Sequence, residues 1–140
     1  MDELNEMIKL SRRLEGAITG RKPSSEEVRR EFIQAYCDAH PEIGLFGAVV
    51  SVVGDKYEKY FISQVQQLQP PIKRKTLIGL FEGLSAECQD VQAQFFKQFN
   101  ISDAQPVPLG YWYEYQEKLF IKTEHYTVEL HLWDGKLMVY

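Results

Sequence analysis

The last thirty residues alternate between apolar and polar side chains, which is the pattern of β-strands with one buried face. The pattern predicts strands over residues 119–121, 126–132 and 137–139, and a further strand over 111–115. The alternating apolar positions are Leu119, Ile121, Tyr126, Val128, Leu130, Leu132, Leu137 and Val139. We therefore expect an antiparallel meander at the end of the chain.

Two short turns set the expected register of this meander. Asp134-Gly135 is a typical two-residue hairpin turn, because Gly accepts the positive φ of a type I′ turn, and it places Leu132 opposite Leu137. A second two-residue connection, at residues 124–125, is expected to place Ile121 opposite Val128 and Leu119 opposite Leu130. Both turns gather the aliphatic residues on one face of the sheet.

Apolar residues at helical spacing predict about five helices in the first hundred residues. The first covers residues 2 to about 19. The second begins at Ser24, which forms a capping box with Glu27. It ends near His40, because Pro41 disfavours the helical conformation in the residue before it.

The next segment, residues 45–53, is rich in Val and fits either a buried strand or the start of a long helix. We favour a helix, because charged residues follow Asp55 at intervals of three and four. A fourth helix is expected with Pro71 in its first turn. A fifth is expected from about Ser85 to Asn100.

These elements predict an α+β fold in which about five N-terminal helices pack on one face of a three- to four-stranded antiparallel meander. A chain of 140 residues suits one domain with its own core. We expect a single domain over residues 1–140, mainly helical over 1–101 and a β-meander over 111–140. Residues 102–110, which include Pro106 and Pro108, connect these two parts, and we interpret them as a crossing within the domain.

Composition narrows the environment of the protein. The formal net charge is −4 with both signs intermixed, so nucleic-acid binding is not expected. The N-terminus lacks the apolar core of a signal peptide. The longest uncharged run, residues 43–54, is too short to span a membrane. With only Cys37 and Cys88, we expect free thiols and a cytoplasmic protein without a membrane partner.

The second face of the predicted sheet is unusually aromatic for a face that meets water. Its expected members are Trp112, Glu114, Phe120, Lys122, Thr127, Glu129, His131, Trp133, Met138 and Tyr140. Three explanations are open: a helix or the crossing of the same chain covers the face, a partner protein binds it, or it forms a small-molecule site. The candidate protein-binding residues are Trp112, Phe120, His131, Trp133, Met138 and Tyr140.

The leading hypothesis is a noncatalytic interaction protein, of the regulator, chaperone or inhibitor type, that binds a protein partner or a second copy of itself. We find no phosphate-binding loop, dinucleotide motif or zinc-protease motif, and no cofactor is expected. The alternative is a small-molecule or enzymatic pocket lined by Tyr113, Tyr115, Tyr126 and residues of the Val-rich segment, in which Glu129 or His131 acts.

Two further clusters have possible chemistry. His125, Glu129 and His131 share parity along the sheet and are metal-ligand types, but their spacing alone does not lead us to predict a metal. The triplet Lys73, Arg74 and Lys75 lies at a predicted helix start, where the helix dipole disfavours cations. A bound phosphate or nucleic-acid anion would relieve this conflict, which makes the triplet a candidate anion site.

Overall fold

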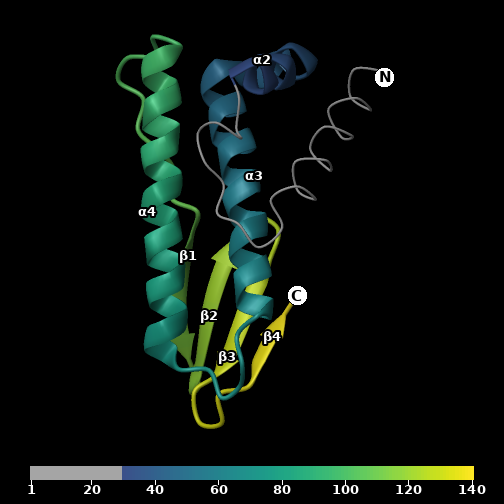
Figure 1. The fold of residues 1–140 in the computed structure, drawn as a ribbon, viewed down its shortest axis with the longest axis vertical. Coiled ribbons are helices and arrows are strands. Elements are labelled where there is room, and N and C mark those ends of the chain that lie inside the picture. Colours follow the sequence, from purple (N-terminus) through teal and green to yellow (C-terminus); the bar gives the residue numbers. More distant parts are fainter. Residues whose placement is uncertain (1–29) are drawn as a thin grey trace.

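The computed structural model describes residues 30–140 of the chain (Figure 1). Its helices are α2 (Arg30–Ala39), the 3-10 helix η1 (Pro41–Ile43), α3 (Gly44–Gln66) and α4 (Arg74–Gln98). Its strands are β1 (Gly110–Tyr115), β2 (Lys118–Thr123), β3 (Thr127–His131) and β4 (Leu137–Val139).

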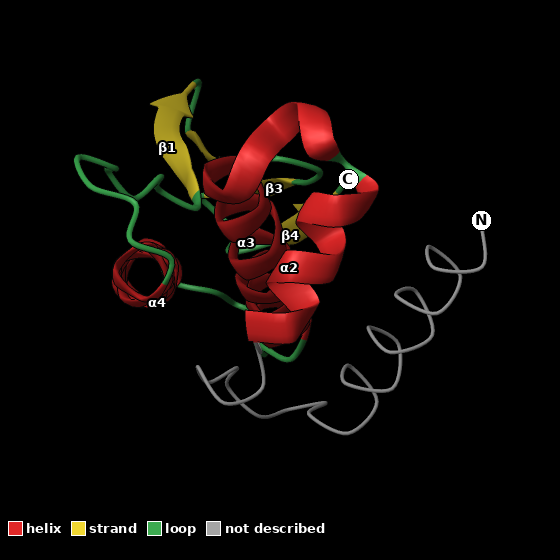
Figure 2. Ribbon diagram, turned by 90° about the horizontal axis from the view of Figure 1, so that it is seen from above, coloured by secondary structure: helices red, strands yellow, loops and turns green. Residues whose placement is uncertain are grey.

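The helices and the sheet form two layers. Helices α3 and α4 run antiparallel to each other along one face of the sheet (Figure 1), and α2 packs beside α3 on the side away from α4 (Figure 2). The predicted α+β class is confirmed. The described residues contain three α-helices, however, and not about five. The helix expected over residues 2–19 and the capping box at Ser24 and Glu27 lie outside the described residues.

The Val-rich segment is helical, as the sequence analysis favoured. It forms the first half of α3, and Val49 and Val53 are fully buried at helical spacing. The end of the preceding helix is also confirmed, since α2 ends at Ala39 and Pro41 begins η1. Proline therefore marked this boundary correctly.

The predicted fourth and fifth helices are a single helix, α4. Its buried residues include Leu77, Phe81, Leu84, Cys88, Val91 and Phe95, which alternate between steps of four and three without a break. Ser85, where a new helix was expected to begin, is buried inside α4. Its hydroxyl accepts a hydrogen bond from the backbone N–H of Leu109 at 3.0 Å, so it holds the crossing and caps no helix.

The expected helix start at Pro71 is also wrong, because α4 begins at Arg74. Lys73, the residue before it, has an extended backbone with φ −88° and ψ 141°. Ile72 is buried, and its N–H donates to the carbonyl of Gly135 at 3.0 Å. This segment is therefore tied to the loop between β3 and β4 before the helix starts.

The sheet is an antiparallel meander in the order β1-β2-β3-β4. The predicted pairing of β2 with β3 is confirmed, with Ile121 opposite Val128 and Leu119 opposite Leu130. The two-residue turn at 124–125 is closed by a hydrogen bond from the N–H of Thr123 to the carbonyl of Tyr126.

The predicted register of β3 and β4 is wrong by two residues. Leu137 lies opposite Leu130, and not opposite Leu132. Leu132 lies in the loop that follows β3, and its N–H donates to the carbonyl of Glu117, which extends the β2–β3 register by one residue pair. Gly135 has the expected positive φ but belongs to a longer loop. Because the shift is an even number of residues, every side chain keeps its face.

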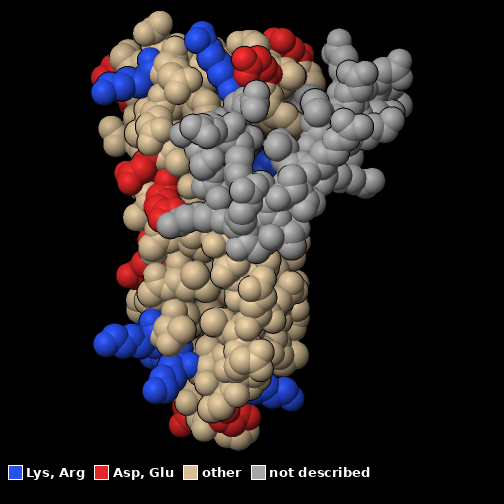
Figure 3. Space-filling model, viewed as in Figure 1, with Lys and Arg blue, Asp and Glu red and all other residues tan. Residues whose placement is uncertain are grey.

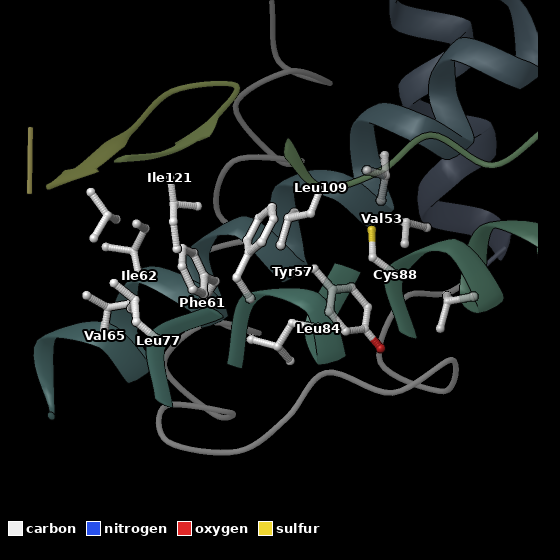
Figure 4. Packing of buried hydrophobic residues seen from close by; sticks show 14 of the residues in the cluster. Val53, Tyr57, Phe61, Ile62, Val65, Leu77, Leu84, Cys88, Leu109 and Ile121 are labelled. Atoms are coloured by element: carbon white, nitrogen blue, oxygen red, sulfur yellow. The ribbon is translucent and has the colours of Figure 1, made fainter. Parts of the chain in front are cut away.

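The core lies between the helices and this aliphatic face (Figure 4). Leu119, Ile121, Val128 and Leu130 are all 0% exposed, and they pack toward α3 and α4. The rings of Phe61 and Phe81 meet edge to face between the two helices, and all of these residues belong to one contiguous buried cluster.

We expect Gly135→Ala to lower the free energy of unfolding by about 2 kcal/mol. Gly135 has φ +71°, and an added methyl would lie 2.7 Å from Cβ of Pro71. Denaturant unfolding measures the effect. The matched control is Gly83→Ala in α4, where an added methyl meets nothing within 4 Å. It should stabilise the protein by about 0.5–1 kcal/mol, and equal effects of the two changes would contradict this account.

Candidate functional site

The sheet face that points away from the helices forms a continuous aromatic surface, which we call the outer face. Strand β1 contributes Tyr111, Tyr113 and Tyr115, because Tyr113 lies opposite Phe120 of β2. Phe120 in turn lies opposite Glu129, and Glu129 opposite Met138. The outer face, with the adjoining Trp133 and Tyr140, is made of Tyr111, Tyr113, Tyr115, Lys118, Phe120, Lys122, Thr127, Glu129, His131, Trp133, Met138 and Tyr140.

The tyrosines and Trp133 of the outer face are exposed, Phe120 and His131 are half-buried, and several of these rings stack on one another. Trp133 is 70% exposed and Tyr140 58%, and no helix of the described part of the chain lies over this face. The ring of Tyr113 stacks on Phe120 with centroids 5.1 Å apart, and on Tyr111 at 6.2 Å. The surface is therefore partly organised before any partner binds.

A carboxylate lies in the middle of this apolar surface. Glu129 is buried, and its Oε2 lies 3.0 Å from Nε2 of His131. The hydrogen bond from His131 lowers the pKa of Glu129; burial opposes the shift and a hydrogen bond from Tyr140 supports it. Burial and the contact with Glu129 raise the pKa of the Tyr140 hydroxyl. The pair fixes the orientation of the histidine ring, on which Trp133 stacks at 5.9 Å.

Two residues assigned to this face by sequence lie on the other side of the sheet. Trp112 is opposite Ile121 and Glu114 is opposite Leu119, so both point toward the helices. The indole N–H of Trp112 donates to Glu82 of α4 at 3.1 Å. The parity of β1 was misjudged because its turn, at Gln116 and Glu117, contains no Gly or Asn, although both residues have positive φ.

This register also removes the pocket that was expected between three tyrosines and the Val-rich segment. Tyr113 and Tyr115 point away from α3, whereas Tyr126 packs against the core on the helix side. These side chains therefore cannot line one cavity. The same register explains why β1 supplies three tyrosines, and not one tryptophan, to the outer face.

Sequence reasoning missed a buried carboxylate that joins the helices to the sheet. Glu58 of α3 is 3% exposed, and its Oε2 accepts the backbone N–H of His125 at 2.8 Å. Its Oε1 lies 2.7 Å from Nδ1 of the same residue. Glu58 therefore holds the tip of the β2–β3 hairpin on the helix. The signal in the sequence was a charge at a core position of α3, which pattern analysis does not distinguish from a surface charge.

The electrostatics of this junction favour an ion pair. Burial raises the pKa of Glu58, but hydrogen bonds from Thr123 and His125 outweigh it and leave the pKa below its usual value. The hydrogen bond to Glu58 raises the pKa of His125, against the opposing effect of burial. The charged forms of both groups are therefore mutually stabilised.

His125 does not meet Glu129 and His131, so the three residues do not form a common metal site. The structure instead brings His125 together with Asp55 and Glu58, whose ligand atoms lie within 4.8 Å of one another. These donor types suit a divalent cation. Each already has a protein partner, since Asp55 pairs with Lys59 at 3.1 Å and Glu58 with His125.

The basic triplet already has an anionic neighbour in the same chain. Arg74 forms an ion pair with Glu114 of β1, and its guanidinium lies over the ring of Trp112 at 5.3 Å. The carboxylate of Glu114 thus offsets the unfavourable charge at the start of α4. Figure 3 shows basic and acidic side chains together at this end of the molecule.

Within residues 30–140, open grooves flank the sheet at two places. One, of about 420 Å³, lies between α4 and β1 and is lined by Phe81, Glu82, Ser85, Ala86, Gln89, Gly110, Tyr111 and Trp112. The other, of about 380 Å³, lies between the start of α4 and the β3–β4 loop and is lined by Pro71, Ile72, Lys73, Arg74, Leu132, Trp133, Asp134 and Gly135. Neither is lined by Glu129 or His131.

Both cysteines are free, as expected. Cys37 is half-buried and Cys88 is buried, and burial raises the pKa of the Cys88 thiol to about 11. The thiolate, which is the reactive form of cysteine, is therefore scarce at Cys88 near neutral pH.

Comparison of the chain with protein-family models, curated proteins and solved structures gave no match. Among residues 30–140, no helix combines the length and the apolar character needed to cross a membrane.

We expect the stabilisation supplied by the His125 side chain to depend on pH. Because the folded-state pKa is raised, this stabilisation is full below the unfolded value of about 6.5 and is lost as pH rises through the folded value. Wild type should exceed His125→Gln in unfolding free energy near pH 6, by less than about 1 kcal/mol because the ring is mostly exposed. The difference should shrink by pH 8.

Urea denaturation at both pH values measures this difference. The matched control is His40→Gln, which replaces a histidine that lies away from the junction beside Glu42. A stability difference for His125→Gln that stayed constant across this pH range would show that the ion pair does not form.

Proposed function

We propose that this protein is a noncatalytic interaction protein, of the regulator, chaperone or inhibitor type, that binds a protein partner through the outer face. The observation that supports this most directly is the exposure of Trp133, Tyr113 and Tyr140 on a surface where rings already stack. Contiguous exposed apolar patches of this kind are typical of interaction sites. Tyrosine and tryptophan are also the residues that contribute most often to binding hot spots.

The side chains of the outer face indicate which kind of partner surface would fit it. Its rings offer apolar area, and its tyrosine hydroxyls offer hydrogen-bond donors around the rim. The buried Glu129 is already hydrogen-bonded to His131, so the centre of the face does not need a cation from the partner. We therefore propose a partner surface with apolar side chains at its centre and hydrogen-bond acceptors around them.

The acid–base groups of the described chain give less support to catalysis. The pair of Glu129 and His131 has suitable geometry, but it lies outside both grooves. The pKa of Cys88 disfavours a nucleophilic role. The free thiols are compatible with a reducing compartment, and we propose a cytoplasmic location.

The anion-binding alternative has weaker support than the outer face. Lys73 and Arg74 line the groove beside Trp133, which would bring basic and aromatic groups together. Arg74 is already paired with Glu114, however, so an incoming phosphate would have to compete with a carboxylate of the same chain.

We expect Trp133→Ser and Phe120→Ser each to reduce the recovery of a partner when the tagged protein is purified from its native host. For a partner recovered in this way, each change should weaken binding by about 2 kcal/mol, roughly thirtyfold, because each removes a large ring from the interface. Isothermal titration of the purified partner measures this loss.

The control variant is Val107→Ser, which alters a residue that is 40% exposed but lies in the crossing, away from the outer face. It should leave binding unchanged. If all three variants bind like the wild type while remaining folded by circular dichroism, the outer face is not the binding surface.

A further inference from the structure

The two edges of the sheet differ in how well they are protected against pairing with another strand. β4 has three residues, and short edge strands discourage further pairing. β1 has six residues, Gly-Tyr-Trp-Tyr-Glu-Tyr, with no Pro and no Lys. Its single charge, Glu114, is paired with Arg74. β1 therefore lacks most of the features that normally protect an edge strand.

The hydrogen bonds along the meander show which backbone groups face the open side of β1. Thr123 donates its N–H to Tyr126, so the odd-numbered residues of β2 bond toward β3 and the even-numbered ones toward β1. The partners of the even-numbered residues are the three tyrosines of β1. It follows that the N–H and C=O groups of Trp112 and Glu114 point to the open edge.

This edge is free within the described chain. No backbone group of residues 30–140 outside the sheet bonds to Trp112 or Glu114. Figure 2 shows β1 at the margin of the sheet, with α3 and α4 on the helix side and no helix beyond the edge. A strand added there would continue the sheet past β1.

We propose that a second copy of this chain pairs with the β1 edge, antiparallel and about a two-fold axis through Tyr113. The interface is formed by backbone groups at the strand edge, with the β1 tyrosines of the outer face beside them, and it does not rest on the proposed partner binding. An isologous contact of this kind needs a strand that is complementary to itself.

The sequence of β1 meets that requirement in one register. With Tyr113 opposite its own copy, Tyr111 lies opposite Tyr115 of the second copy, so all three tyrosines face tyrosines on the outer side. Trp112 lies opposite Glu114 of the second copy, and these are the residues whose backbone groups face the edge. Aromatic cross-strand pairs of this kind stabilise sheets.

The charges agree with the same register. Arg74 lies over Trp112, so Glu114 of the second copy would approach a guanidinium as well as a ring. A two-fold axis through Glu114 would instead oppose two carboxylates, which is unfavourable. An axis through Trp112 would leave Tyr115 without a tyrosine opposite it.

Disulfide trapping tests the register directly. In a Cys37→Ser background, Tyr113→Cys should form a disulfide-linked dimer on mild oxidation, because residues in a non-hydrogen-bonded pair have Cα atoms about 4.5 Å apart. Tyr111→Cys alone should not, since its copy would lie about 14 Å along the strand. A mixture of Tyr111→Cys and Tyr115→Cys should give the mixed dimer. The buried Cys88 remains as an internal control.

Sedimentation velocity of the unmodified protein provides the second measurement. The apparent mass should rise from 16.3 kDa toward twice that value as concentration increases. Glu114→Pro should abolish the rise, because it removes an edge-facing N–H that β2 does not use. Glu114→Ala keeps that N–H and should still dimerise, as should Trp133→Ser.

Three outcomes would overturn the proposal. The first is a Tyr113→Cys variant that stays monomeric on oxidation, together with an unmodified protein that stays at 16.3 kDa. That result would exclude a second copy at the edge, and a peptide of another protein would be the remaining candidate. The second is equal trapping of Tyr111→Cys alone, which would indicate random collision. The third is a dimer lost in Trp133→Ser but kept in Glu114→Pro, which would assign self-association to the outer face. Trapping does not depend on whether Glu114→Pro folds.

Discussion

The structure depends on one row of aliphatic side chains, Leu119, Ile121, Val128 and Leu130, being removed from water between the sheet and α3 and α4. Full burial of each contributes about 1.5–3 kcal/mol. Because successive side chains of a strand point to opposite faces, this burial forces the side chains of Tyr113, Phe120 and Met138 outward. The aromatic outer face is therefore a geometric consequence of how the core is built.

Buried polar groups then fix how the layers are placed. Glu58 binds the backbone of the β2–β3 hairpin tip, and Ser85 binds the backbone of Leu109 at the start of the sheet. Gln92, 1% exposed, makes two hydrogen bonds of 2.9 Å to the backbone of Val107. Apolar packing alone would tolerate several positions of the sheet relative to the helices. Each of these hydrogen bonds forms at only one relative position of the two layers.

The sequence predicted the strands, the β2–β3 register and the helical nature of α3, because these follow from periodicity and from local turn chemistry. It failed where tertiary contacts decide. The loop between β3 and β4 is tied to Ile72 through the carbonyl of Gly135, and Ser85 is used by the crossing and not as a cap. The candidate face was predicted in its β2–β4 part. Its β1 part was inverted because Gln116 and Glu117 form a tight turn without the residues that usually mark one.

The fastening of the crossing by Gln92 and Ser85 has a consequence for variation in chain length. The side chains of Gln92 and Ser85 hold the last part of the crossing, at Val107 and Leu109. The segment just before the crossing is held at the end of α4, because the N–H of Ile101 donates to the carbonyl of Phe96. The stretch between these anchors is not part of the core strands. Extra residues there would add only the slowly growing entropy of a longer loop and would leave the alignment of sheet and helices unchanged.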